Sequence, residues 1–206
     1  DVERAADELS RCRRKVINAD SVERVRGIEG DAATSYFGVF PHLILNQKES
    51  FVFKGRNRRP PKDAVNAMLS FVYTLISNDV TAALETVGLD PYVGFMHALR
   101  PGRPSLALDI MEELRAYLGD RLVLSLINRK QITGNQFLQQ GDESIIMTDD
   151  ARRTIISAWQ ARKKEQIQHP FLNEKVSIGL LPHIQAMMLA RYLRNDLDDY
   201  PVFLIQ

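Results

Sequence analysis

The sequence predicts a mostly α-helical domain built from several helices, with at most one short β-hairpin. Apolar residues recur at helical spacing along most of the 206 residues. Helix-capping residues stand where such stretches begin or end, as with Ser21, Asp63 and Gly88. Turn residues between two short apolar runs occur convincingly only at 136–148. We therefore expect residues 1–206 to form one helical domain.

Each expected helix follows from its own pattern of apolar residues and boundary signals. Ser21 is a plausible N-cap, Asp63 another, and Ser105 a third, while Gly88 suits the residue just after a helix. The expected helices cover residues 1–19, 21–44, 63–87, 105–115, 121–130, 148–168 and 178–194. The hairpin is expected around Gly141 and Asp142.

Composition places few limits on what the domain binds. Hydrophobic residues make up 45% and charged residues 26%, which is typical of a globular protein. The formal net charge is only +1, so any binding of nucleic acid must come from local clusters of cations. The single cysteine, Cys12, excludes an internal disulfide and fits a reducing cytoplasm. No apolar run is near the length that crosses a bilayer, and Asp1 without a preceding methionine suggests a start inside a longer protein.

The stretch from Gly94 to Arg115, GFMHALRPGRPSLALDIMEELR, carries the richest chemistry. His97 precedes a basic loop, and the following helix bears Asp109, Glu112 and Glu113. Helical periodicity places Asp109 and Glu113 at the edge of an apolar stripe and turns Glu112 away from it. Imidazole and carboxylates together bind divalent metals, but the same acids also suit the solvated face of an amphipathic helix, with a structural histidine nearby.

A second carboxylate, Glu29, lies among small residues in the helix expected at 21–44. Glycine costs about 1 kcal/mol relative to alanine inside a helix, so Gly27 and Gly30 suggest that another backbone comes close. A carboxylate in such a place needs a cation, which is either a metal ion or the nearby Arg26.

A cluster of cations follows at 54–62, in a loop broken by glycine and proline. Five of these nine residues are basic: Lys54, Arg56, Arg58, Arg59 and Lys62. A phosphate backbone is the natural partner of such a cluster, although a short basic run is also common in a solvated loop.

Taken together, these segments resemble the CRISPR-associated adaptation integrase, the universal spacer-acquisition endonuclease, and are most like its subtype I-C form. The resemblance covers nearly the whole chain. It is carried by RGIEGDAATSYF (26–37), FKGRNRRPPKDAVNAMLSFVYTLI (53–76), GLDPYVGFMH (88–97), GRPSLALDIMEELR (102–115), RLVLSLINRKQ (121–131) and HPFLNEKVSIGLLPHIQAMMLARYLRNDLDDYPVF (169–203).

The resemblance implies a function and a site. It implies a metal-dependent DNA endonuclease and integrase that inserts new spacers into a CRISPR array by transesterification. It implies that Glu29, His97 and Asp109 hold Mg²⁺ or Mn²⁺, and it favours Glu112 over Glu113 as the accessory acid. The chain then matches the C-terminal helical catalytic domain, and the family's N-terminal β-rich dimerisation domain has no equivalent in it.

The resemblance also implies partners: double-stranded and branched DNA, a second copy of the chain, and a small ferredoxin-like adaptation protein, all in the cytoplasm. We expect seven basic residues to hold the DNA backbone: Lys54, Arg56, Arg58, Arg59, Arg100, Arg103 and Lys163.

Two other classes of protein share some of these features. A helical metal-dependent phosphohydrolase normally carries an adjacent His-Asp pair, and no such dipeptide occurs in the sequence. A helical DNA-binding scaffold would use Glu29 and His97 only structurally. The remaining histidines, His42, His169 and His183, lie in apolar or proline-rich contexts, and we expect them to be structural.

Overall fold

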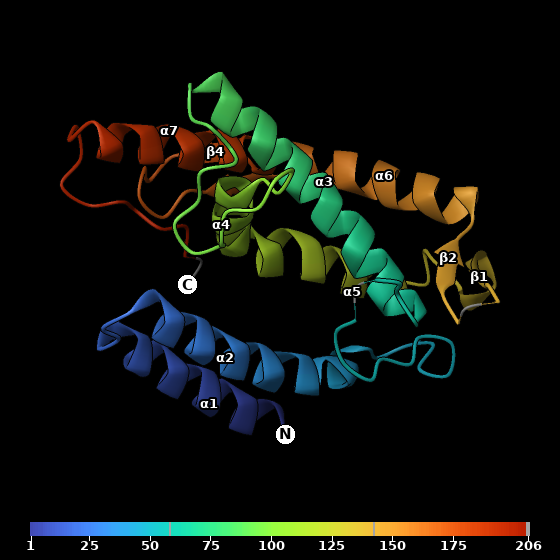
Figure 1. Ribbon diagram of the computed structural model, residues 1–206. Coiled ribbons are helices and arrows are strands. Elements are labelled where there is room, and N and C mark those ends of the chain that lie inside the picture. The colour runs from blue at the N-terminus through green and yellow to red at the C-terminus, as the bar shows by residue number, and fades with distance from the viewer. Residues whose placement is uncertain (58, 142, 205–206) are drawn as a thin grey trace. The chain divides into compact units, whose positions relative to one another are not determined.

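The computed structural model describes residues 1–57, 59–141 and 143–204, and it is mostly helical, as predicted (Figure 1). The chain divides into two compact units. The first comprises Asp1–Met68 and Leu124–Ala151, and the second comprises Leu69–Val123 and the chain from Arg152 onward. All three boundaries between the units fall inside helices, so α3 (Ala64–Thr86), α5 (Arg121–Asn128) and α6 (Asp149–Lys164) contribute to both.

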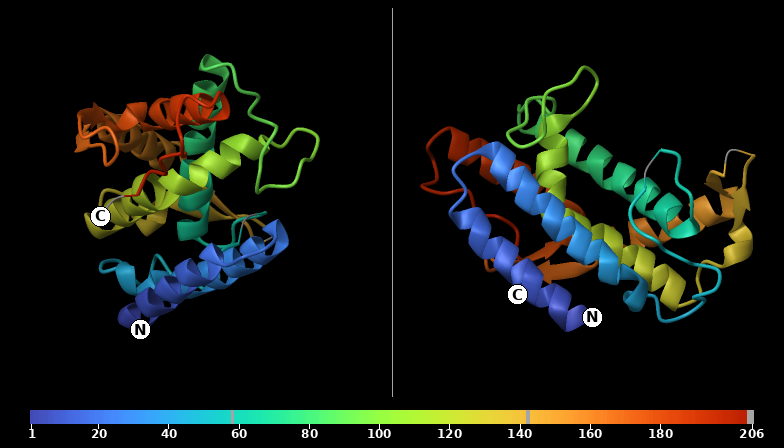
Figure 2. Two further views of the ribbon diagram at one scale, coloured as in Figure 1. Left: turned by 90° about the vertical axis from the view of Figure 1, so that its left-hand side faces the viewer. Right: turned by 60° about the horizontal axis from the view of Figure 1, so that its bottom comes forward.

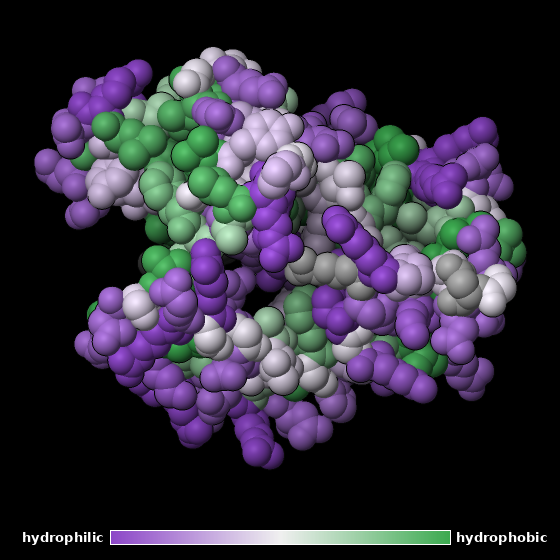
Figure 3. Space-filling model, viewed as in Figure 1, coloured by the Kyte–Doolittle hydropathy of each residue, from purple (hydrophilic) through white to green (hydrophobic). Residues whose placement is uncertain are grey.

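The first unit begins with two helices, α1 (Val2–Ile17) and α2 (Val22–Leu43), which lie side by side (Figures 1 and 2). The hydroxyl of Ser21 accepts a hydrogen bond from the Arg24 amide at 3.4 Å, which confirms the expected N-cap of α2. The visible outward side of this pair is mostly hydrophilic in Figure 3.

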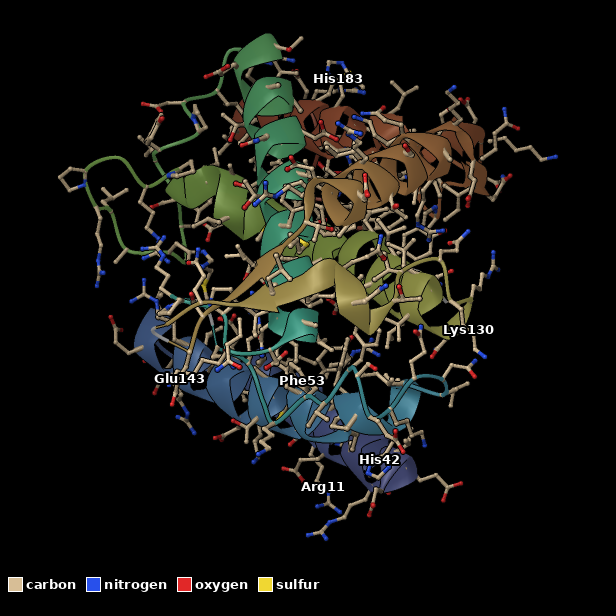
Figure 4. The ribbon with its side chains drawn as sticks, turned by 90° about the vertical axis from the view of Figure 1, so that its right-hand side faces the viewer. Arg11, His42, Phe53, Lys130, Glu143 and His183 are labelled. Atoms are coloured by element: carbon tan, nitrogen blue, oxygen red, sulfur yellow. The ribbon has the colours of Figure 1, made fainter. Side chains whose placement is uncertain are left out.

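An aromatic cluster forms the core of the first unit beside α2. The ring of Phe53 lies 5.2 Å from that of Phe40 and 6.0 Å from that of Phe37, and all three are buried. Figure 4 labels Phe53 in the loop that runs beside α2. The side chain of Asn128 fixes the end of α2, because it accepts from the Leu45 amide and donates to the Leu43 carbonyl. This packing explains why the helix ends where the chain turns.

The expected hairpin is present in the first unit. Strand β1 (Phe137–Gln139) pairs antiparallel with β2 (Ile145–Met147), with Leu138 opposite Ile146. Asp142, at the expected turn, lies outside the described residues. Asp63, the expected cap of α3, accepts a hydrogen bond from the Asn66 amide at 2.7 Å.

The second unit contains most of α3, then α4 (Ser105–Leu114), a π-helix (Arg115–Asp120) and the start of α5. The C-terminal elements of this unit are most of α6 (Asp149–Lys164), β3 (Gln166–Gln168), β4 (Lys175–Ser177), a 3₁₀ turn (Ile178–Leu180) and α7 (Leu181–Leu193). Helices α4 and α7 pack together. Gly88, with φ of 80°, follows α3 as expected.

Three local expectations differ from the structure. Ser105 is the first residue of α4 and not its cap, because its hydroxyl donates to the Ala98 carbonyl at 3.1 Å. Helix α6 ends at Lys164, four residues before the expected end. The residues beyond it form β3 and β4, a second hairpin that the sequence did not reveal, since strands of three residues show no periodicity.

Helix α3 also corrects the expectation about membrane-length segments. By length and composition alone, Ala64–Thr86 could cross a bilayer. Seven of its large apolar side chains are fully buried, however: Val65, Met68, Leu69, Val72, Ile76, Val80 and Leu84. This burial is the pattern of a core helix.

Candidate functional site

The loop between α3 and α4 is held in place by one carboxylate of the second unit, Asp109. Its Oδ2 atom accepts hydrogen bonds from the amides of Phe95 and Met96 at 2.6 and 3.0 Å. Its Oδ1 atom accepts from the amide of His97 at 2.9 Å and contacts the imidazole Nδ1 of the same residue at 2.6 Å. Both oxygens of Asp109 are therefore engaged by the loop, which Figure 2 (left) shows running between the two helices.

Close packing between this loop and α4 explains why residue 94 is a glycine. A Cβ atom at Gly94 would lie 2.7 Å from Asp109 Oδ2 and 2.7 Å from the carbonyl carbon of Ser105. The carbonyl of Pro91 accepts from the amides of Leu106 and Ala107, in the first turn of α4. The loop thus covers the helix N-terminus and leaves no room for a side chain at 94.

The surroundings of Asp109 determine its charge and the position of the hydrogen on the His97 imidazole. Burial raises the pKa of Asp109, but the hydrogen bond from His97 and the three backbone amides outweigh it and leave that pKa below its ordinary value of 3.8. Asp109 is therefore ionised at neutral pH, and Nδ1 of His97 carries the hydrogen that points to it. The lone pair of a neutral His97 is then on Nε2, the arrangement typical of a metal-binding histidine oriented by a carboxylate.

The two glutamates that follow Asp109 have different partners. Glu112 Oε1 accepts from Arg115 Nη1 at 2.8 Å, and the Glu112 side chain is 30% exposed. Glu113 instead accepts from the Tyr200 hydroxyl at 2.6 Å, from Gln185 Nε2 at 2.8 Å and from the Phe203 amide at 2.9 Å. Glu113, which periodicity alone favoured, therefore anchors the C-terminal segment.

Gln185 is a buried hub that the sequence analysis missed. Its Oε1 atom lies 3.3 Å from Nε2 of His169, and its Nε2 donates to Glu113, to the Tyr200 hydroxyl and to the Pro201 carbonyl. Nδ1 of His169 accepts from two backbone amides, so Nε2 carries its hydrogen. A glutamine at a buried position of an apolar helix is the signal that could have revealed this network.

The other two histidines, His42 and His183, are not part of the His97–Asp109 pair. His42 lies 3.4 Å from Asp1 at the surface of the first unit, and His183 lies on α7 (Figure 4). His169 is buried in its network, whereas His42 is exposed and His183 half-buried, so the structural role expected for these two stays a prediction.

Glu29 lies on α2 in the first unit and is exposed. Among the described residues its carboxylate has no hydrogen-bonding or ionic partner. A Cβ atom at Gly27 or Gly30 would meet nothing within 4 Å, so the expected close approach of another backbone is not seen. Arg26 Nη1 lies 4.0 Å from Glu23, and the alternative pair of Arg26 with Glu29 is not formed.

The complete metal triad stays a prediction. His97 and Asp109 are in contact within the second unit, whereas Glu29 belongs to the first. Over the described residues of either unit, no group of three His, Cys, Asp or Glu side chains forms a metal-binding cluster. The donor set nevertheless suits Mg²⁺ or Mn²⁺, because an oriented imidazole and hard carboxylate oxygens are their ligands.

The expected DNA-binding cations fall into two groups. Lys54, Arg59 and Arg100 are exposed, and Arg103 is half-buried. Arg56 instead donates to Asn66 Oδ1 at 2.7 Å, and Lys163 forms an ion pair with Asp79 at 2.7 Å. These two cations are engaged inside their own units and are the weaker candidates for phosphate contacts. Arg58 lies outside the described residues.

The fold is that of known CRISPR-associated structures. A Cas1 protein from Thermotoga maritima matches 92% of this chain with a TM-score of 0.82 and 30% sequence identity, over 57% of its own length. A Cas6-RT-Cas1–Cas2 complex contains a chain that matches 98% of this one with a TM-score of 0.85 and 27% identity, over 22% of that chain. The helical arrangement therefore defines a class of CRISPR-associated domain.

The sequence comparisons name the family. The family of CRISPR-associated protein Cas1 matches residues 1–161, and the chain belongs to this family. The CRISPR-associated endonuclease Cas1 1 of Chlorobaculum tepidum is 56% identical over 95% of this chain. Cas1 2 of Rhodospirillum rubrum is 54% identical over 97%. The chain spans 57% and 58% of the length of these two relatives.

Proposed function

We propose that the chain is the C-terminal catalytic region of a subtype I-C-like, metal-dependent DNA endonuclease and integrase. Its reaction is the insertion of new spacers into a CRISPR array by transesterification at a phosphodiester. The observation that supports this proposal most directly is the His97–Asp109 pair, in which Nδ1 of the imidazole lies 2.6 Å from Oδ1 of the carboxylate. Membership of the Cas1 family, with relatives named as endonucleases, supports the same reaction class.

In this proposal each side chain of the site has a distinct task. His97 and Asp109 belong to the expected metal triad with Glu29, and His97 offers Nε2 to Mg²⁺ or Mn²⁺. Asp109 also orients the imidazole through its contact with Nδ1. Glu29 and Glu112 supply carboxylate oxygens, and Glu112 does so by sharing or releasing Arg115. The ion, when bound, stabilises charge on the attacking and departing oxygens of the phosphodiester.

The proposed substrates and partners follow from the same reading. The exposed cations Lys54, Arg59 and Arg100, together with the half-buried Arg103, hold the phosphates of double-stranded or branched DNA. A second copy of the chain and a small ferredoxin-like adaptation protein complete the assembly in the cytoplasm. Support for such a partner comes from the similar structure described as a Cas6-RT-Cas1–Cas2 complex.

Alanine variants test the proposal. Glu29→Ala, His97→Ala and Asp109→Ala should each keep the fold and lose Mn²⁺-dependent cleavage of branched DNA in a gel assay of the full-length chain. Glu23→Ala, which changes an 82% exposed side chain on the same helix as Glu29, should cleave normally. Full activity in any of the three variants contradicts that residue's assignment. DNA binding without cleavage by the unaltered chain would favour the scaffold alternative.

A further inference from the structure

The loop that carries His97 also exposes an unusual number of large apolar side chains. Four of them lie within eight residues: Tyr92 at 48%, Val93 at 57%, Phe95 at 60% and Leu99 at 65% exposure. Exposed apolar residues are common singly, but a group on one loop next to His97, the proposed metal ligand, indicates a binding surface.

This surface is held rigidly. The amides of Phe95, Met96 and His97 all donate to Asp109, and Gly94 packs against α4 too closely to admit a side chain. The Phe95 ring is therefore exposed on a backbone that is already ordered in the folded protein, so binding need not order it again. An exposed ring on an ordered backbone loses little conformational entropy when it binds a partner.

The charges around the ring favour a polyanion. Arg100 and Arg103 lie on the same loop, and Asp90 at its start accepts a hydrogen bond from the Tyr92 amide within a turn. Aromatic rings interleaved with cations are typical of surfaces that bind single-stranded nucleic acid, where rings stack on bases and cations hold phosphates.

Phe95 is also close along the chain to His97, the proposed metal ligand. Only Met96 separates it from His97, so their Cα atoms are at most about 7 Å apart. The exposed Phe95 ring and the His97 imidazole therefore belong to the same short, fixed stretch of the loop.

We propose that Phe95 stacks on an unpaired base of the bound DNA and so determines which phosphodiester is presented to His97. This inference rests on the proposed endonuclease function and adds a positioning residue to it. Specificity for branched or single-stranded junctions follows, because a base held in a duplex is already stacked on its neighbours.

The test uses the full-length chain and branched DNA with the fluorescent base 2-aminopurine at the unpaired position beside the cleaved bond. Binding is followed by fluorescence in Ca²⁺, and single-turnover cleavage is followed in Mn²⁺. Wild type should quench the fluorescence by stacking. Phe95→Ala should lose the quenching and cleave about 5- to 150-fold more slowly, the fold-change expected from loss of one stacked base. Phe95→Trp should restore both signals.

Two further variants separate this inference from the proposed function. Phe171→Ala removes another exposed ring of the second unit, at 55% exposure, and should behave as wild type. His97→Ala should keep the quenching and lose cleavage. Wild-type quenching and rate in Phe95→Ala, with His97→Ala inactive, would overturn the stacking role and leave the endonuclease function standing. A change from dimer to monomer in Phe95→Ala, with quenching unchanged, would instead show a protein interface.

Discussion

His97 Nδ1 and Asp109 Oδ1 lie 2.6 Å apart, and this contact joins residues separated by twelve positions in the chain. The same carboxylate receives three successive backbone amides. Asp109 therefore fixes both the path of the loop and the direction of the imidazole, so a single substitution should affect both.

Asp109→Asn is the sharpest test of this coupling. An amide keeps the size of the carboxylate but cannot accept from all four donors, so the loop should loosen and His97 should lose its orientation. We expect a 10- to 100-fold loss of activity or metal affinity, about the effect of removing such a supporting group. Hydrogen exchange at the amides of Phe95 to His97 should become faster. Asp196→Asn, which alters an exposed pair with Arg194, is the control, and unchanged exchange in Asp109→Asn would contradict the coupling.

Asp109 should also make the stability of the domain depend on acid. Its pKa in the folded protein lies below 3.8, so its contribution to the free energy of unfolding is complete above pH 3.8 and declines as the pH falls through the folded value. The difference in stability between wild type and Asp109→Asn should therefore narrow below about pH 3.8. Urea unfolding at a series of pH values measures this, and a constant difference would show that the carboxylate is not stabilised in the folded state.

Gly94→Ala should destabilise the loop. Its Cβ would overlap both Asp109 and the backbone of Ser105, and forced overlap of this kind costs about 1–3 kcal/mol. Gly30→Ala on α2 is the matched control, because that Cβ meets nothing within 4 Å and should stabilise the helix by up to about 1 kcal/mol. Thermal unfolding compares the two. Equal stability of both variants would show that the loop can move away from α4.

Glu113→Ala should release the C-terminal segment. The Tyr200 hydroxyl, Gln185 Nε2 and the Phe203 amide would each lose an acceptor, and unsatisfied buried donors cost about 1–3 kcal/mol. Glu112→Ala, one residue away, should change stability much less because Glu112 is partly exposed. Limited proteolysis after residue 194 should be faster in Glu113→Ala alone, and equal rates in both variants would contradict the anchoring role.

Tyr200 should make the stability of the domain depend on pH in the alkaline range. Burial, the nearby charge of Glu113 and the hydrogen bond to Glu113 raise the pKa of Tyr200 above its ordinary value of 10, against a smaller opposite effect of Gln185. The neutral phenol is thus favoured in the folded state, and its contribution is complete below pH 10 and falls as the pH rises above it. Tyr200→Phe should reduce the loss of stability between pH 10 and 11.5, as measured by chemical unfolding. An unchanged profile would place the alkaline sensitivity elsewhere.

Much of the helical fold could be predicted because its signals are local. Ser21 and Asp63 cap the helices they were expected to cap, and Gly88 takes the positive φ expected after α3. The second hairpin could not be predicted, because Gln166–Gln168 is too short for an alternating pattern. The sequence singled out His97, Asp109, Glu113 and Glu29 as candidates for the site, and the resemblance added Glu112, but none of their contacts could be predicted. That Asp109 accepts from the loop while Glu113 faces the C-terminal segment depends on tertiary contacts, which helical spacing does not encode.

The amide of Gln185 has a polarity that only one side chain can supply. Its oxygen faces a hydrogen on His169, and its nitrogen faces the oxygens of Glu113, Tyr200 and Pro201. A glutamate at 185 would place its carboxylate against that of Glu113. A leucine of similar size would leave His169 and Glu113 without this hydrogen-bond partner. The amide of Gln185 therefore fits in one orientation only. If it were flipped, its nitrogen would face the N–H of His169 and its oxygen would face the acceptor oxygens of Glu113 and Pro201.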